Sequence, residues 1–124
     1  MAKFNEHCMD CEKILGEKCE DVNRWMDELY AKYAANHRRH RHCWKGVREA
    51  KHLWGERGMK AAIIHIVRDC GEVPNQRDYD KQNLGIIIAP EYLIYDGLNE
   101  KAFDKFKRAV EAEFEKAAEK LGGE

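Results

Sequence analysis

Histidine and arginine side chains are concentrated in one short stretch of this 124-residue chain. Four of the six histidines lie between positions 37 and 52. The interval 37–60 contains eight Lys or Arg against two Glu, a local charge of +6. Since the net charge of the chain is −1, the remainder carries −7. A basic stretch on an otherwise acidic chain favours an anionic partner, such as a phosphate-containing ligand or nucleic acid. A solvated helix face would have the same composition.

The spacing of these residues defines a candidate anion site. On a continuous α-helix through this stretch, His37, Arg38, Arg41 and His42 share one polar face. The apolar side chains of positions 43–54 fall on the opposite face. We therefore expect Arg38 and Arg41 to bind an anion through paired guanidinium donors, with His42 as a proton donor.

A histidine and a carboxylate form a second candidate group. His65 and Asp69 are four residues apart, so they lie on one face of a helix. A carboxylate beside a histidine orients the ring and raises its pKa. Such a pair serves as a general base or as part of the ligand shell of a metal ion. It is also a common structural hydrogen bond.

The cysteines suggest a third group. Cys8 and Cys11, with His7 beside them, have the spacing of half a zinc site. Completing it with His42 and Cys43 matches no common zinc module, so free and partly buried thiols are the favoured interpretation. Five cysteines without an export signal predict a reducing cytoplasm.

Helical spacing dominates the chain and predicts an all-α single domain over residues 1–124, a bundle of four or five helices. We expect a helix over 4–20 that breaks at Gly16. A second begins near Asp21 and runs on, or kinks, to a stop at Gly55 and Gly58. A short, mostly buried helix over 59–70 should end at Gly71.

The C-terminal third contains one clear element and one ambiguous element. Residues 99–121 form an amphipathic pattern that Asn99 can cap, a helix for packing or for homo-oligomer formation. Ile86 to Ile88 favour a small β element near residue 87 because they are β-branched. No apolar run approaches 18 residues, so no membrane partner is expected.

The pattern of residues resembles a known family. The run His37-Arg38-x-x-Arg41-His42-x-x-x-Gly46 and the run His65-Ile66-x-x-Asp69-x-Gly71-x-Val73-Pro74 carry the likeness. Upstream, Trp25-Met26-Asp27 and His7 extend it. Over residues 7–80 the chain resembles an uncharacterised family of small bacterial and phage proteins, a domain of unknown function. The resemblance marks a set of polar, site-forming residues: His7, Asp27, His37, Arg38, Arg41, His42, His65 and Asp69. It implies no activity.

Three functions fit these residues. The first is a metal-dependent enzyme similar to a phosphohydrolase, with one divalent metal ion that lowers the pKa of a bound water. Arg38 and Arg41 would hold the phosphate. His42 and Asp27 would be catalytic. The candidate metal ligands are His7, His37, His65 and Asp69.

Two alternatives involve no reaction. One is a phage or bacterial binding or inhibitor module that captures a nucleotide, a nucleic acid or a host protein through the basic face of residues 37–60. The other is a buried network of His, Asp and Arg side chains that fixes helix packing.

Overall fold

The computed structural model describes residues 2–81, 87–94 and 97–121, and it is all-α, as predicted. The longer helices are α1 (Phe4–Leu15), α2 (Glu20–Asp27), α5 (Trp44–Cys70) and α6 (Glu100–Leu121). Short helical turns connect and follow them: α3 (Tyr30–Tyr33), η1 (Ala34–His37), α4 (Arg38–Arg41), η2 (Gln76–Lys81) and η3 (Glu91–Leu93).

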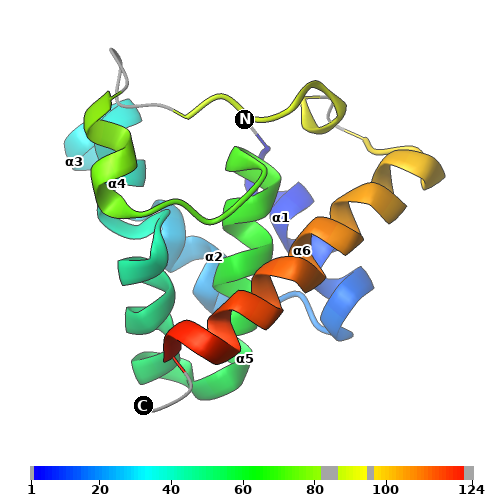
Figure 1. The fold of residues 1–124 in the computed structure, drawn as a ribbon, viewed down its shortest axis with the longest axis horizontal. Coiled ribbons are helices and arrows are strands. Elements are labelled where there is room, and N and C mark those ends of the chain that lie inside the picture. The colour runs from blue at the N-terminus through cyan, green and yellow to red at the C-terminus, as the bar shows by residue number, and fades with distance from the viewer. Residues whose placement is uncertain (1, 82–86, 95–96, 122–124) are drawn as a thin grey trace.

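The second half of α5 is the centre of the bundle. Residues 61–70 are buried on every side, which marks a helix surrounded by others. Helices α1, α2 and α6 all pack against it. Figure 1 shows α6 crossing in front of α5, with α1 and α2 behind. A polar side chain on this part of α5 is therefore held inside the protein.

Several helix ends lie where the sequence predicts them. Gly16 ends α1 and Gly71 ends α5, both in the left-handed conformation, with φ of 86° and 89°. Only glycine adopts this conformation at little steric cost. The Asn99 Oδ1 accepts a 2.8 Å hydrogen bond from the backbone N–H of Ala102 and so caps α6. Gly55, where the sequence predicts a stop, breaks the helical conformation inside α5 with φ of 73°, and the helix resumes after this kink.

The prediction of a continuous helix through positions 37–54 is wrong. The chain leaves the helical conformation at His42 and is extended at Cys43 before α5 begins. The freed backbone groups find partners far along the chain: the Trp44 N–H donates to the Pro74 carbonyl over 3.0 Å. The Tyr79 hydroxyl donates to the His42 carbonyl over 2.6 Å.

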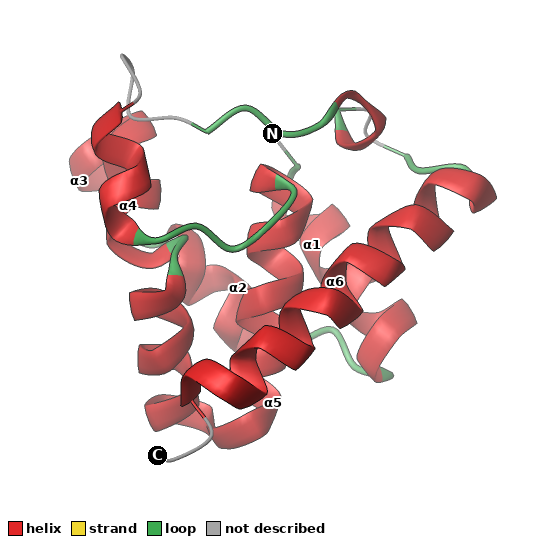
Figure 2. Cartoon of the chain, viewed as in Figure 1, coloured by secondary structure: helices red, strands yellow, loops and turns green. Residues whose placement is uncertain are grey.

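Gly46 makes this corner between α4 and α5 tight. A Cβ atom at Gly46 would overlap the backbone carbonyl of Arg41, so the two segments approach as closely as they do because this residue has no side chain. The corner rotates His42 away from the face that it would share with Arg41 on one helix. In Figure 2 the helices are red and the loops that join them are green.

The β element predicted near residue 87 is absent from the described residues. Residues 87–90 are irregular and lead into η3, and the described part of the chain has no strand. Positions 84–86 lie outside the described residues.

Helix α6 packs on α5 through buried side chains that include Phe106 and Val110. No described helix is long and apolar enough to cross a membrane.

Candidate metal centre

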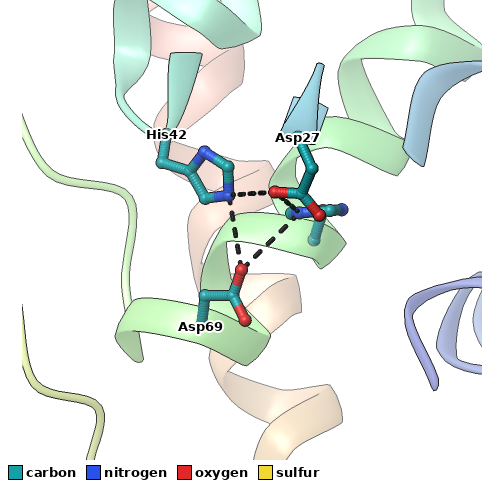
Figure 3. Close-up of side chains that lie close together, drawn as sticks. Asp27, His42 and Asp69 are labelled. Atoms are coloured by element: carbon teal, nitrogen blue, oxygen red, sulfur yellow. Dashed lines mark hydrogen bonds and ion pairs between the residues drawn. The ribbon is translucent and has the colours of Figure 1, made fainter. Parts of the chain in front are cut away.

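Four side chains converge at one point inside the bundle. Single ligand atoms of Asp27, His42, His65 and Asp69 all lie within 4.8 Å of one another. Asp27 ends α2, His42 lies at the corner before α5, and the other two side chains project from α5. Figure 3 shows His42 and the carboxylates of Asp27 and Asp69 pointing toward a shared centre. These four residues are called the His/Asp tetrad below.

Around the perimeter of the tetrad, each histidine nitrogen lies between two carboxylate oxygens. His42 Nε2 lies 3.4 Å from Asp27 Oδ1 and 3.3 Å from Asp69 Oδ2. His65 Nε2 lies 3.3 Å from the same Asp27 oxygen and 3.6 Å from the same Asp69 oxygen. A tetrahedral ion with bonds of about 2.1 Å has ligand atoms about 3.4 Å apart. The spacing along the perimeter is therefore that of a metal site.

Asn23 fixes the orientation of the His65 ring. The Asn23 Nδ2 donates to the carbonyls of Lys18 and Cys19 over 3.0 and 3.1 Å, which leaves its Oδ1 facing His65 Nδ1 at 2.9 Å. An amide oxygen only accepts hydrogen bonds, so His65 Nδ1 carries the hydrogen. In the neutral ring, Nε2 then presents a lone pair to the two carboxylates. Histidines that bind metals are commonly oriented in this way through their second nitrogen.

His37 is oriented by the same principle. Its Nδ1 lies 2.8 Å from the backbone carbonyl of Ala34, which can only accept. Its Nε2 lies 3.1 Å from Asp27 Oδ1, the oxygen that also faces His42 and His65. Three ring nitrogens thus converge on one carboxylate oxygen. His37 is 1% exposed and lies at the edge of the tetrad, where it contacts Asp27.

His7 lies on the other side of His65. The two rings stack with centroids 3.5 Å apart and an angle of 9° between their planes. His7 Nε2 lies 3.4 Å from Asp69 Oδ1, the oxygen that does not face the tetrad. His7 therefore orients the Asp69 carboxylate and supports the His65 ring. The metal-ligand set predicted from the sequence differs from the tetrad, in which Asp27 and His42 take the places assigned to His7 and His37.

Several buried polar atoms of this region have no hydrogen-bond partner of good geometry within the described chain. They include both ring nitrogens of His42 and of His7, and Asp69 Oδ2. Buried polar groups are normally satisfied, because leaving one unpaired costs about 1–3 kcal/mol. Atoms of two ligand types aimed at one point, and unsatisfied there, indicate a binding site for a cation.

The pKa shifts of the tetrad residues result from their burial and from the contacts between histidines and carboxylates. Burial lowers the pKa of His42 to about 4 and also lowers the pKa of His65, so both rings are neutral at pH 7. Burial alone would raise the pKa of the Asp69 carboxyl, but the neighbouring His7 and the contact with His42 hold it well below its usual value. The pKa of Asp27 is likewise lowered by His65 and His37 against the effect of burial. Two carboxylates and neutral rings therefore face one another.

The two predicted anion-binding arginines are separated. Arg38 is buried, and its Nη2 lies 3.8 Å from Asp69 Oδ1, beside the tetrad. The Arg41 Nη1 donates over 2.6 Å to the Trp25 carbonyl and over 3.2 Å to Glu28, and its guanidinium lies over the Trp25 ring. The expected pairing of Arg38 and Arg41 is wrong: both residues belong to α4, but the Arg38 guanidinium lies beside Asp69, whereas the Arg41 guanidinium contacts Trp25 and Glu28. Arg41 holds α4 against α2.

The cysteine-based zinc set is also not assembled. The thiols of Cys8 and Cys11 lie 3.8 and 3.6 Å from Asn23 Nδ2. The Cys43 thiol donates to the Arg39 carbonyl, and His42 faces the carboxylates instead. All five cysteines are free and buried.

Two cavities reach the tetrad from outside. One, of about 420 Å³, is lined by His37, Arg38 and Asp69 on its polar side. The other, of about 430 Å³, is lined by Asp27 and His37. The Asp27 side chain is 34% exposed, whereas the other three tetrad side chains are at most 1% exposed. Asp27 is therefore the tetrad side chain most exposed to solvent.

Asn23 and Tyr79 contact the tetrad residues His65 and His42, and the sequence analysis assigned a role to neither. Asn23 precedes Asp27 by four residues, the spacing of His65 and Asp69, so a second one-face polar pair was visible in the sequence. Tyr79 carries no comparable signal, since its contact with the His42 carbonyl depends on the path of the chain. We find no match to a protein family, a curated protein or a solved structure. The resemblance to the family of unknown function therefore stays a prediction.

Proposed function

We propose that this protein is a divalent-metal-dependent phosphohydrolase. The observation that carries the proposal is the orientation of His65 and His37. Each ring has its Nδ1 hydrogen committed to an oxygen that can only accept, so in the neutral form each would turn an Nε2 lone pair toward the Asp27 carboxylate. Lone pairs facing a carboxylate repel it unless a proton or a metal cation lies between them. A divalent ion held by the tetrad removes this repulsion.

The ligand types favour a particular group of ions. Two imidazoles and two carboxylates suit Zn²⁺, Mn²⁺, Fe²⁺ or Co²⁺ better than Ca²⁺, which prefers oxygen ligands alone. His37 would be the fifth ligand. Such an ion lowers the pKa of a bound water so that hydroxide is available near neutral pH. A site that only stabilises the fold is closed, whereas this one adjoins two cavities.

The charge balance favours a phosphate ester as the substrate. Two carboxylates and Arg38 give the centre a charge of −1 with neutral histidines, and a divalent ion would change this to +1. Arg38 lines the cavity of about 420 Å³ and can donate to phosphate oxygens. Asp27, the most exposed of the four tetrad side chains, is placed to accept a proton from a water in the adjoining cavity. Free thiols suit a reducing cytoplasm as its location.

The binding-module alternative has less support. It requires Arg41 on a shared basic face, and Arg41 is committed to Trp25 and Glu28. The structural-network alternative predicts the same buried cluster but no metal and no turnover.

Hydrolysis of p-nitrophenyl phosphate by chelator-treated protein tests the proposal. We expect activity only after Mn²⁺, Zn²⁺, Fe²⁺ or Co²⁺ is restored, and a loss of at least 100-fold in kcat/KM for Asp69→Asn. Asp104→Asn, an exposed carboxylate on α6, is the control and should keep full activity. Metal-independent activity, or none with any of these ions, would contradict the proposal.

A further inference from the structure

The cavity of about 420 Å³ beside the tetrad has a polar side and an apolar side. His37, Arg38, Arg68 and Asp69 form the polar side. The apolar side comes from a segment distant in the sequence, residues 87–94, and consists of Ile87, Ile88, Ala89, Leu93 and Ile94. Tyr30 also lines the cavity. The five side chains from residues 87–94 are called the apolar wall below.

The exposure of this wall is unusual for the protein. Among the described residues, the large apolar side chains that remain exposed are Met9, Tyr30, Leu53, Ile88 and Ile94. Three of these five line the one cavity, with Ile88 84% and Ile94 56% exposed. Single exposed apolar residues are ordinary, but a group gathered around a cavity marks a binding surface.

The wall is fixed in place by the fold. Leu93 is buried in the hydrophobic core and anchors η3. Pro90 packs against Gly71, where an added Cβ atom would overlap the proline ring. Gly71 immediately follows the last turn of α5, which carries Asp69, so this contact holds the wall next to the tetrad. A molecule bound in this cavity would therefore contact both the apolar side and the polar side.

We infer that the substrate is a small phosphate ester whose organic group is apolar or aromatic. This inference rests on the proposed function, because it places the phosphate at Arg38 and the metal. The organic group then lies against Ile88 and Ile94, with the Tyr30 ring available for aromatic contact. A cavity of about 420 Å³ accommodates a phosphate with one or two rings. Sugars, polyols and polyphosphate would leave the wall in contact with water or with polar groups.

Phosphonates test this inference without turnover, since their carbon–phosphorus bond is not hydrolysed by phosphate-ester chemistry. Isothermal titration of Mn²⁺-loaded protein compares 1-naphthylphosphonate with methylphosphonate. We expect the naphthyl compound to bind at least about tenfold more tightly, because it buries more apolar surface. Ile88→Asn and Ile94→Asn should each remove most of this advantage and change methylphosphonate affinity less than twofold.

Leu53→Asn is the matched control, since Leu53 is 58% exposed on α5 and does not line the cavity. It should leave both affinities unchanged, and melting temperatures verify that all three variants fold. Equal affinity for the two phosphonates in the wild-type protein, or no effect of the wall variants, would overturn the inference. A strong naphthyl preference without hydrolysis of naphthyl phosphate would uphold the binding site and contradict the proposed reaction.

Discussion

The amide oxygen of Asn23 lies 2.9 Å from Nδ1 of His65, and this contact determines which ring nitrogen faces the tetrad. Replacing Asn23 with Leu removes the acceptor and allows the ring to rotate or to carry its hydrogen on Nε2. We expect metal affinity to fall about 10–100-fold, the usual cost of losing such a supporting group. Titration with Mn²⁺ or Zn²⁺ measures the change.

Asn99→Ala is the control for that variant. Asn99 caps α6 and is remote in sequence from the site, so its loss should lower the free energy of unfolding by about 1 kcal/mol. Metal affinity should not change. Equal metal affinities for wild type and Asn23→Leu would show that Asn23 only stabilises the fold.

Tyr79 supports the metal site through the backbone of His42. Tyr79→Phe leaves the buried His42 carbonyl without its 2.6 Å hydrogen bond. The free energy of unfolding should fall by about 1–3 kcal/mol, and metal affinity should fall with it because His42 is less constrained. Tyr92→Phe, at a half-buried tyrosine outside the site, is the comparison. A stability loss with no change in metal binding would limit Tyr79 to a structural role.

Gly46 controls the corner that brings His42 into the tetrad. In Gly46→Ala, the new methyl group overlaps the Arg41 carbonyl, so α4 must move away from α5. We expect a loss of about 1–3 kcal/mol in unfolding free energy, in the range of overpacked cores, and weaker metal binding. Gly97→Ala places its methyl group in open space and should be nearly neutral. Chemical denaturation of both variants tests whether residue 46 can carry a side chain without a loss in unfolding free energy.

The metal-free protein should lose stability as the pH falls from about 6.5 to 5. The pKa values of His42 and His65 are lowered by burial, so in this range the unfolded chain binds protons that the folded chain does not. His7 has a raised pKa, and its contribution is fully present below pH 6.5 and declines only above it. His42→Gln should reduce the slope of unfolding free energy by up to about 1.4 kcal/mol per pH unit.

Exposed His52 offers the control, since His52→Gln should leave the slope unchanged. Denaturant unfolding at several pH values, in the presence of chelator, gives the slopes. An unchanged slope in His42→Gln would mean that His42 titrates normally in the folded protein.

Local signals predicted most of the fold. The period of α6, the cap at Asn99 and the glycines that end α1 and α5 act over a few residues, so they are visible in the sequence. The corner at His42 was not predictable, because its backbone partners, Pro74 and Tyr79, lie more than 30 positions away.

The same limit applied to the candidate site. His65 and Asp69 were paired from their spacing alone, and the structure brings the two side chains together. The roles of Asp27 and His42 were assigned differently, because they depend on how α2 and the corner pack against α5. Arg41 was placed with Arg38 because the two lie three residues apart on one helix, and their spacing does not show that the two guanidinium groups contact different partners.

The most direct test of the central claim is the metal content of the purified protein. Chelator-treated protein is incubated with Zn²⁺, Mn²⁺, Fe²⁺ or Co²⁺, gel-filtered and analysed by plasma mass spectrometry. We predict one ion per chain for the wild type and none for Asp27→Asn combined with Asp69→Asn. At 100 times the dissociation constant, the ion should also add about 2.7 kcal/mol to the free energy of unfolding. Wild-type protein that retains no stoichiometric ion, and whose unfolding does not respond to excess metal, would contradict the account.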